Sequence, residues 1–274
     1  MSTASTTRGA RYRFDRPTFS VIMRDLRIPR DDLGVGDPIP RIDLPTIEGG
    51  RFSTDSMVAD GRPVLLVFGS LTCPVTESAG PGLLDLHRRY GDAIRFVVVN
   101  VREAHPGADI PQPSAIEEKM RNTRALGRHH GFAFEVAVDD IDGTVHRAFG
   151  TRPSSAYIID PSGTIVFRAH WSNRREPLED ALRAVVAGRA PSRPNVGQTI
   201  RALIRMAVYA DVALDAAGRG ALRDFWRAAP PAAAMITLSR LFRFLPNDRR
   251  IAPTVAATLA LCAAAAAGIW LVLP

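Results

Sequence analysis

Short apolar runs alternate with amphipathic segments through the middle of the chain, and this alternation predicts strands separated by helices. Runs rich in Val, Ile and Phe predict strands at 64–68, 96–101 and 134–138, with helices between them at about 74–90 and 114–129. Strands that are joined through helices in this order pair in parallel.

The pattern changes after residue 155. Two apolar runs, 156–160 and 164–168, are joined by Pro161-Ser162-Gly163, which predicts an antiparallel hairpin, and a helix is expected at 176–186. The fold class expected for this part is therefore α/β, with a central mixed sheet flanked by helices.

The last third of the chain is rich in Ala, Leu and Arg and is expected to be organised separately. The segment 199–250 contains two predicted helices, at 199–216 and 220–244, which either lie in a lipid headgroup layer or pack on the main domain as a small bundle. The 24 residues of 251–274 carry no charge, which predicts a C-terminal transmembrane anchor, with a buried hairpin helix as the alternative. Arg249 and Arg250 precede the anchor, so the catalytic domain is expected on the cytoplasmic side of the membrane.

These patterns predict five parts. They are an N-terminal extension at 1–36, a globular domain at 37–190, a linker at 191–198, an amphipathic helical region at 199–250 and the anchor at 251–274.

The net charge of +7 comes almost wholly from arginine, since Lys119 is the one lysine of the chain. There is no zinc-ligand pattern and no basic strand interleaved with aromatic residues, so nucleic acid is not expected as a partner. A membrane surface is the expected partner of the arginines. The two cysteines, Cys73 and Cys262, are not expected to pair, which agrees with a reducing compartment. The N-terminus lacks the apolar core of a secretory signal.

Candidate catalytic residues lie where the first predicted strand ends, in the segment Phe68-Gly69-Ser70-Leu71-Thr72-Cys73-Pro74. Proline is favoured in the first turn of a helix, so Cys73 is expected at the helix N-terminus. The helix dipole and the free N–H groups there favour the thiolate over the thiol. An inert buried cysteine is the alternative.

A βαβα half that is followed by a ββα half, with a cysteine at the first strand-to-helix junction, resembles the thioredoxin fold. The segment 35–50 is similar to the lead-in hairpin of peroxiredoxin-like members, and Pro153 is placed to occupy the proline position that faces the reactive sulfur in such folds.

Two segments resemble the iodothyronine deiodinase family and its bacterial relatives. The first is the FGSxT sequence at 68–72 followed by Cys73, where that family has selenocysteine, and the second is Val101-Arg102-Glu103-Ala104-His105-Pro106 at the end of the next strand. Ile110-Pro111-Gln112-Pro113 and Phe149-Gly150 continue the likeness, which covers roughly 37–187. The chain has Pro113 where animal members carry a histidine in the segment that holds thyronine, and it has Ser155 where they carry an arginine.

The resemblance implies that Cys73 is the nucleophile and that Glu103 and His105 act as acid/base and proton-relay groups. Independently of it, neighbouring parallel strands present their C-terminal ends at one edge, so His105 is expected near Cys73, where an imidazole could stabilise the thiolate. Thr72 is expected to donate to the sulfur or to a bound oxygen. The expected substrate-binding residues are Ser70, Pro74, Arg152 and Pro153.

Thr76 stands where a thioredoxin has its second cysteine, so an external thiol must reduce an oxidised Cys73. A thioredoxin-like protein or a low-molecular-weight thiol is the expected reductant, no bound cofactor is expected, and a homodimer is possible. His129 and His130 end a predicted helix and are interpreted as partners of its dipole, so no metal is expected.

The expected function is a membrane-tethered, thiol-dependent oxidoreductase of deiodinase-like type, whose small-molecule substrate presents an electrophilic atom such as aryl iodine. One alternative is a one-cysteine peroxidase, in which Arg152 would be the cation over the thiolate. A second alternative is a non-catalytic redox sensor or membrane scaffold.

Overall fold

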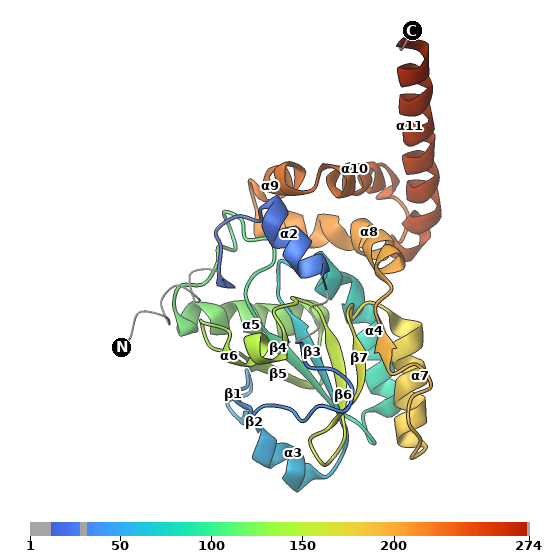
Figure 1. The fold of residues 1–274 in the computed structure, drawn as a ribbon. Helices are drawn as coiled ribbons and strands as arrows, with labels where there is room; N and C mark the ends of the chain where they lie inside the picture. The colour runs from blue at the N-terminus through green and yellow to red at the C-terminus, as the bar shows by residue number, and fades with distance from the viewer. Residues whose placement is uncertain (1–11, 28–31, 273–274) are drawn as a thin grey trace.

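The computed structural model describes residues 12–27 and 32–272, so part of the predicted 1–36 extension and the last two residues of the predicted anchor lie outside the described residues. Its centre is a mixed sheet with the strand order β5-β4-β3-β6-β7-β8 (Figure 1). The strands are β3 (Val64–Gly69), β4 (Arg95–Asn100), β5 (Glu135–Val138), β6 (Ala156–Ile159), β7 (Ile165–Ala169) and β8 (Asn195–Val196).

Strand directions agree with the sequence pattern. β3 pairs in parallel with β4, and β4 with β5, while β6 pairs antiparallel with both β3 and β7. All six residues of β3 are buried, as expected for a central strand covered on both faces. The predicted α/β class, with a mixed central sheet flanked by helices, is confirmed.

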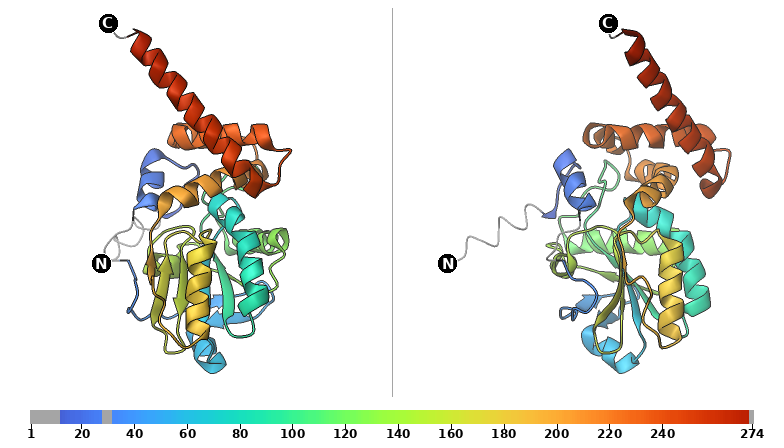
Figure 2. Two further views of the ribbon diagram at one scale, coloured as in Figure 1. Left: turned by 90° about the vertical axis from the view of Figure 1, so that its right-hand side faces the viewer. Right: turned by 45° about the vertical axis from the view of Figure 1, so that its right-hand side comes forward.

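Two apolar layers cover the sheet. On one face α4 (Pro74–Tyr90), α5 (Ile116–His130) and α7 (Arg175–Val186) contribute Leu83, Leu86, Leu126, Leu178 and Leu182 to the core (Figure 2). The other face is covered by the β1 (Asp43–Pro45) and β2 (Arg51–Ser53) hairpin, by α3 (Thr54–Asp60) and by α6 (Thr144–Phe149). The sequence pattern did not predict α3 or α6, which are only seven and six residues long.

The region 199–250 forms a helical bundle on the domain, which is the second of the two arrangements left open by its sequence. It comprises α8 (Thr199–Ala217), α9 (Ala221–Ala228), α10 (Pro230–Ser239) and the short 3₁₀ helices η1 (Arg240–Phe242) and η2 (Asn247–Arg250). The helix expected over 220–244 is broken near Pro230, because a proline ring clashes with the preceding helical turn. In Figure 1 the bundle and α2 (Phe19–Leu26) lie over one end of the sheet.

Two of the expected parts differ from the structure. The predicted linker 191–198 contains β8, which is hydrogen-bonded to the sheet edge beside β7. The predicted anchor is the helix α11 (Ile251–Val272), which projects from the body in Figures 1 and 2. Within 12–27 and 32–272, however, no helix combines the length and the apolar character needed to cross a bilayer, so the predicted membrane span is not supported.

Candidate functional site

The candidate nucleophile stands at the start of α4. Cys73 is the residue before the first helical turn, with an extended backbone, and Pro74 follows as the first helical residue. The predicted strand end and helix start are therefore confirmed. The Cys73 side chain is only 2% exposed, and its sulfur lies 3.0 Å from the Ser154 hydroxyl oxygen, a hydrogen bond in which either group can donate.

A buried carboxyl group lies beside the cysteine loop. The Glu103 carboxylate accepts hydrogen bonds from the Thr72 backbone N–H at 3.0 Å and from the Thr72 hydroxyl at 2.7 Å. Asn122 of α5 donates to its other oxygen at 3.2 Å. Burial raises the pKa of Glu103, and the hydrogen bonds from Thr72 and Asn122 oppose that rise. The site thus holds a carboxyl group that is biased toward its protonated form.

His105 is joined to this network through its backbone. Its N–H donates to the Thr72 hydroxyl oxygen at 3.2 Å, so Thr72 connects the two predicted acid/base residues. The ring packs on Phe225 of α9 at 4.8 Å between centroids, and its buried Nδ1 has no hydrogen-bond partner within the described residues. Burial, together with the nearby Arg102, lowers the pKa of His105 to about 4, so its ring is neutral at neutral pH.

The remaining predicted substrate-binding residues take different positions. Ser70 is buried, and its hydroxyl accepts a hydrogen bond from the Ala104 backbone N–H at 3.3 Å. It therefore connects the ends of β3 and β4. Arg152 is also buried; it forms an ion pair with Asp32 and donates to the Arg27 carbonyl oxygen at 2.6 Å. Pro153 directly precedes Ser154, the hydrogen-bond partner of the sulfur, and the peptide bonds of the described residues are all trans.

Sequence reasoning missed three polar residues of this network: Ser154, Asn122 and Gln112. The Gln112 side chain accepts from the Glu103 N–H at 2.8 Å and donates to the Glu103 carbonyl oxygen at 3.2 Å. Gln112 belongs to the segment 110–113, which was noted in the sequence, whereas a lone serine after a proline or an asparagine inside a helix gives no pattern to detect.

The helical bundle covers this edge of the sheet. Cys73 and Ala104 belong to one buried apolar cluster with residues of α8, α9 and α10, including Met206, Leu214 and Phe225. The loop after His105 is tied to the end of α8, because the N–H groups of Asp109 and Ile110 both donate to the Ala217 carbonyl oxygen, at 3.0 and 3.3 Å. The helical bundle therefore shields the Cys73 sulfur from solvent.

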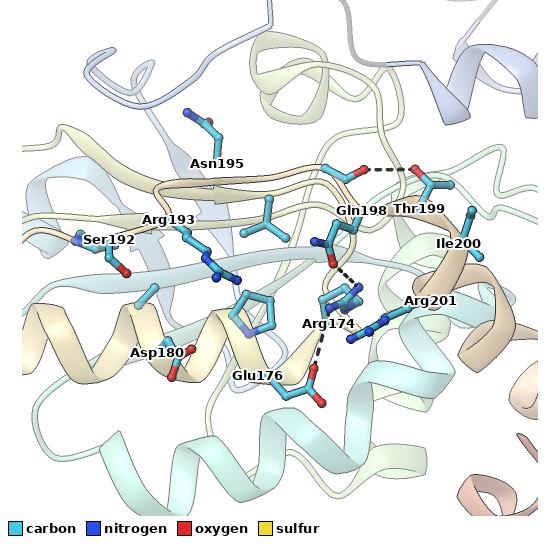
Figure 3. A pocket seen from close by; sticks show the side chains of 15 residues that line it. Arg174, Glu176, Asp180, Ser192, Arg193, Asn195, Gln198, Thr199, Ile200 and Arg201 are labelled. Atoms are coloured by element: carbon cyan, nitrogen blue, oxygen red, sulfur yellow. Dashed lines mark hydrogen bonds and ion pairs between the residues drawn. The ribbon is translucent and has the colours of Figure 1, made fainter.

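A groove lies away from the candidate site. A cavity of about 1010 Å³ lies between the start of α7, the β8 segment and the start of α8, and its lining side chains are drawn in Figure 3. Arg174, Arg193 and Arg201 line it, and Arg174 donates to the Gln198 side-chain oxygen at 3.0 Å. Neither Cys73, Glu103 nor His105 lines this groove, so it is distinct from the candidate site.

A cysteine at the strand-to-helix junction of this βαβ…ββα arrangement defines the class of fold: the central domain is a thioredoxin-like α/β domain. Residues 35–168 are similar to the AhpC/TSA family.

Parts of two curated proteins and of one solved structure are similar to this chain. The chain is 30% identical over 155 residues to the methylamine utilization protein MauD of Methylorubrum extorquens, covering 56% of this chain and 65% of MauD. It is 25% identical over 143 residues to thyroxine 5-deiodinase of Rattus norvegicus, covering 48% of this chain and 46% of the deiodinase. The chain thus spans less than two thirds of the length of these relatives. A solved hypothetical protein of Sinorhizobium meliloti 1021 is 20% identical, with a TM-score of 0.49, and the comparison covers 61% of this chain and 91% of that one.

Replacing Glu103 with glutamine tests the buried carboxyl group. Because the fold raises the pKa of this acid, its contribution to stability is complete below the unfolded pKa, near 4.5, and is lost as the pH rises through the folded pKa. Glu103→Gln is therefore expected to increase the free energy of unfolding relative to wild type at pH 8, by an amount that shrinks toward pH 5. Urea unfolding at several pH values measures this difference.

The exposed Glu48→Gln is the matched control, since it removes a carboxylate that water already solvates. A Glu103→Gln protein whose stability relative to wild type does not change between pH 5 and pH 8 would contradict the raised pKa.

Proposed function

We propose that the chain is a one-cysteine, thiol-dependent reductase whose Cys73 attacks the iodine of an aryl iodide. The observation that carries the proposal is the buried Glu103 carboxyl group, hydrogen-bonded to Thr72 immediately before the nucleophile. A reductive dehalogenation must deliver a proton to the ring carbon that loses iodine, and a carboxyl group with a raised pKa is suited to supply it. The likeness to deiodinases, whose active-site sequence Cys73, Glu103 and His105 resemble, supports the same chemistry.

The proposed reaction has two stages. The Cys73 thiolate attacks iodine, the carbon–iodine bond breaks, and the carbon takes a proton, which leaves the arene and a sulfenyl iodide on Cys73. An external thiol then displaces iodide to form a mixed disulfide, and a second thiol releases Cys73 and the oxidised reductant. The second stage needs no second cysteine in the chain, in agreement with Thr76 at the position of a resolving cysteine.

His105 fits a substrate-binding task. Its ring is neutral, and its buried Nδ1 lacks a partner among the described residues. A buried nitrogen without a hydrogen-bond partner carries a desolvation cost. A substrate hydroxyl that donates a hydrogen bond to this nitrogen removes that cost. We therefore assign His105 to substrate orientation and Glu103 to proton delivery.

A one-cysteine peroxidase is the second candidate, and the match of residues 35–168 to the AhpC/TSA family favours it. In that reaction the thiolate takes an oxygen atom from a hydroperoxide, releases the alcohol or water, and becomes a sulfenic acid that two external thiols reduce. The cation expected for this reaction, Arg152, is engaged by Asp32, which favours the dehalogenase.

The experiment incubates the full chain with dithiothreitol and either 4-iodophenol or hydrogen peroxide. We expect enzyme-dependent iodide release, with about 100-fold slower release in Glu103→Gln and unchanged release in Glu48→Gln, because general acid catalysis typically contributes a factor of that order. Peroxide consumption without iodide release would replace the first candidate by the second. Activity with neither substrate would reject both and favour a sensor or scaffold.

A further inference from the structure

Three side chains with metal-binding atoms meet where α4 and α5 lie against each other. Glu77 is in the first turn of α4, and His129 and His130 are the last two residues of α5. The Glu77 carboxylate oxygen lies 2.8 Å from His129 Nε2 and 3.7 Å from His130 Nε2, and the three ligand atoms all lie within 4.8 Å of one another. Glu77 is 52 residues from His129 along the chain, so no sequence spacing indicated this group.

The His130 ring is held in place by its surroundings. A Cβ atom added to Gly80 of α4 would lie 2.3 Å from His130 Nδ1, so the ring occupies space that any other residue at position 80 would fill. On the other side the ring stacks on Phe132, with 4.9 Å between centroids. This contact with α4 and Phe132 leaves Nε2 as the nitrogen that faces Glu77.

The two histidines are electrostatically different. Burial lowers the pKa of His130 to about 4, so this ring is neutral and has a lone pair to donate at neutral pH. The hydrogen bond to Glu77 raises the pKa of His129, which is half exposed and can lose its proton to water when a cation arrives.

We propose that Glu77, His129 and His130 form a binding site for a first-row transition-metal dication, for which Zn²⁺ is the best match. Zinc takes imidazole nitrogen at about 2.0–2.1 Å and carboxylate oxygen at about 2.0–2.2 Å, which sets neighbouring ligand atoms about 3.3 Å apart in a tetrahedron. The two Glu77–histidine distances bracket this separation, so small side-chain movements suffice. Two imidazoles and one carboxylate disfavour Mg²⁺ and Ca²⁺, because these ions select oxygen ligands. The three protein ligands leave the fourth tetrahedral position for water.

A metal ion bound at this site would restrain the first turn of α4. The Glu77 backbone N–H donates to the Cys73 carbonyl oxygen at 2.9 Å, so the proposed ligand and the candidate nucleophile share the first helical turn. An ion that joins Glu77 to the end of α5 would fix this turn and stabilise the folded chain according to its affinity.

Zinc chloride titrated into the full chain after removal of metals by chelation tests the proposal. We expect about one zinc ion per chain, an increase in melting temperature with zinc concentration, and visible absorption typical of tetrahedral coordination when Co²⁺ replaces zinc. His129→Gln is the most informative variant, because its half-exposed ring can be replaced without disturbing the core. We expect it, Glu77→Gln and His130→Gln to weaken zinc binding at least tenfold.

Two controls distinguish this site from others. Glu117→Gln removes an exposed carboxylate at the opposite end of α5, and Cys73→Ser removes the thiol that zinc would also bind; both are expected to leave the zinc affinity unchanged. Absence of saturable uptake, uptake that His129→Gln does not weaken, or uptake that is lost in Cys73→Ser would each overturn the proposal.

Discussion

Replacing Cys73 with serine is expected to abolish thiol-dependent turnover, with a loss of at least about 10⁴-fold in kcat/KM. A serine hydroxyl is not ionised near neutral pH and is a far weaker nucleophile toward iodine or peroxide oxygen, and loss of a covalent nucleophile commonly costs this much or more. Iodide release and peroxide consumption by the full chain in the presence of dithiothreitol measure the effect.

Cys262 supplies the matched control for this substitution. It is exposed on α11, whereas Cys73 is buried beside Ser154, so Cys262→Ser is expected to keep full activity. Cys73→Ser should remain folded, because serine is slightly smaller and can keep a hydrogen bond to Ser154. Residual turnover within tenfold of wild type in a folded Cys73→Ser protein would exclude Cys73 as the nucleophile.

The second large effect concerns access to the sulfur. In the native chain Cys73 is expected to react with N-ethylmaleimide at least about 100-fold more slowly than Cys262, because its side chain is 2% exposed under the helical bundle while Cys262 is in contact with solvent. Reaction at Cys73 requires a local opening, and its rate reports the free energy of that opening. Peptide mass spectrometry over a time course measures both rates in one sample.

Gly107→Ala is expected to raise the Cys73 rate about tenfold or more and to leave the Cys262 rate unchanged. A Cβ at position 107 would lie 2.2 Å from the Ala217 carbonyl oxygen, so the end of α8 must separate from the loop after His105. That separation breaks the two hydrogen bonds to Ala217, each worth about 1 kcal/mol, and a 1.4 kcal/mol change alters an equilibrium tenfold.

Gly82→Ala is the control for the access experiment. A Cβ at position 82 on α4 would meet the Arg175 side chain at 3.8 Å, which is ordinary contact, so the Cys73 rate should not change. Equal Cys73 rates in wild type and Gly107→Ala would show that the contact between this loop and α8 does not control access.

Much of the central domain followed from local sequence. Apolar runs located β3, β4 and β5 to within a residue or two, and Pro161-Ser162-Gly163 located the turn between β6 and β7. These features are readable because a buried strand and a tight turn each restrict the residues at consecutive positions. The helices α3 and α6 were not predicted, since a helix of six or seven residues is too short to show a repeated apolar pattern.

The candidate site was predicted in part. The positions of Cys73 at a helix start and of Glu103 and His105 after the next strand followed from the rule that parallel strands end at one edge. Which side chains meet there did not follow: the sulfur shares a hydrogen bond with the Ser154 hydroxyl, and the His105 backbone N–H donates to the Thr72 hydroxyl oxygen. Side-chain partners depend on the geometry of several loops at once, and no single sequence window contains them.

The C-terminal region shows the same limit on a larger scale. Its apolar character was evident, yet its contact with the sheet edge was one of two alternatives, and the expected membrane span is not supported among the described residues. An apolar helical face has a similar sequence pattern whether lipid or protein covers it.

The sequence by itself therefore determined the order of strands and helices, the position of the lone domain cysteine at a helix start, and the absence of a resolving cysteine. Only the tertiary structure decided that α8–α10 cover Cys73, that Ser154 contacts its sulfur, and that Glu77 meets His129 and His130. The physical reason is that backbone conformation is encoded by neighbouring residues, whereas burial, protonation and ligand geometry arise from residues that packing brings together from distant parts of the chain.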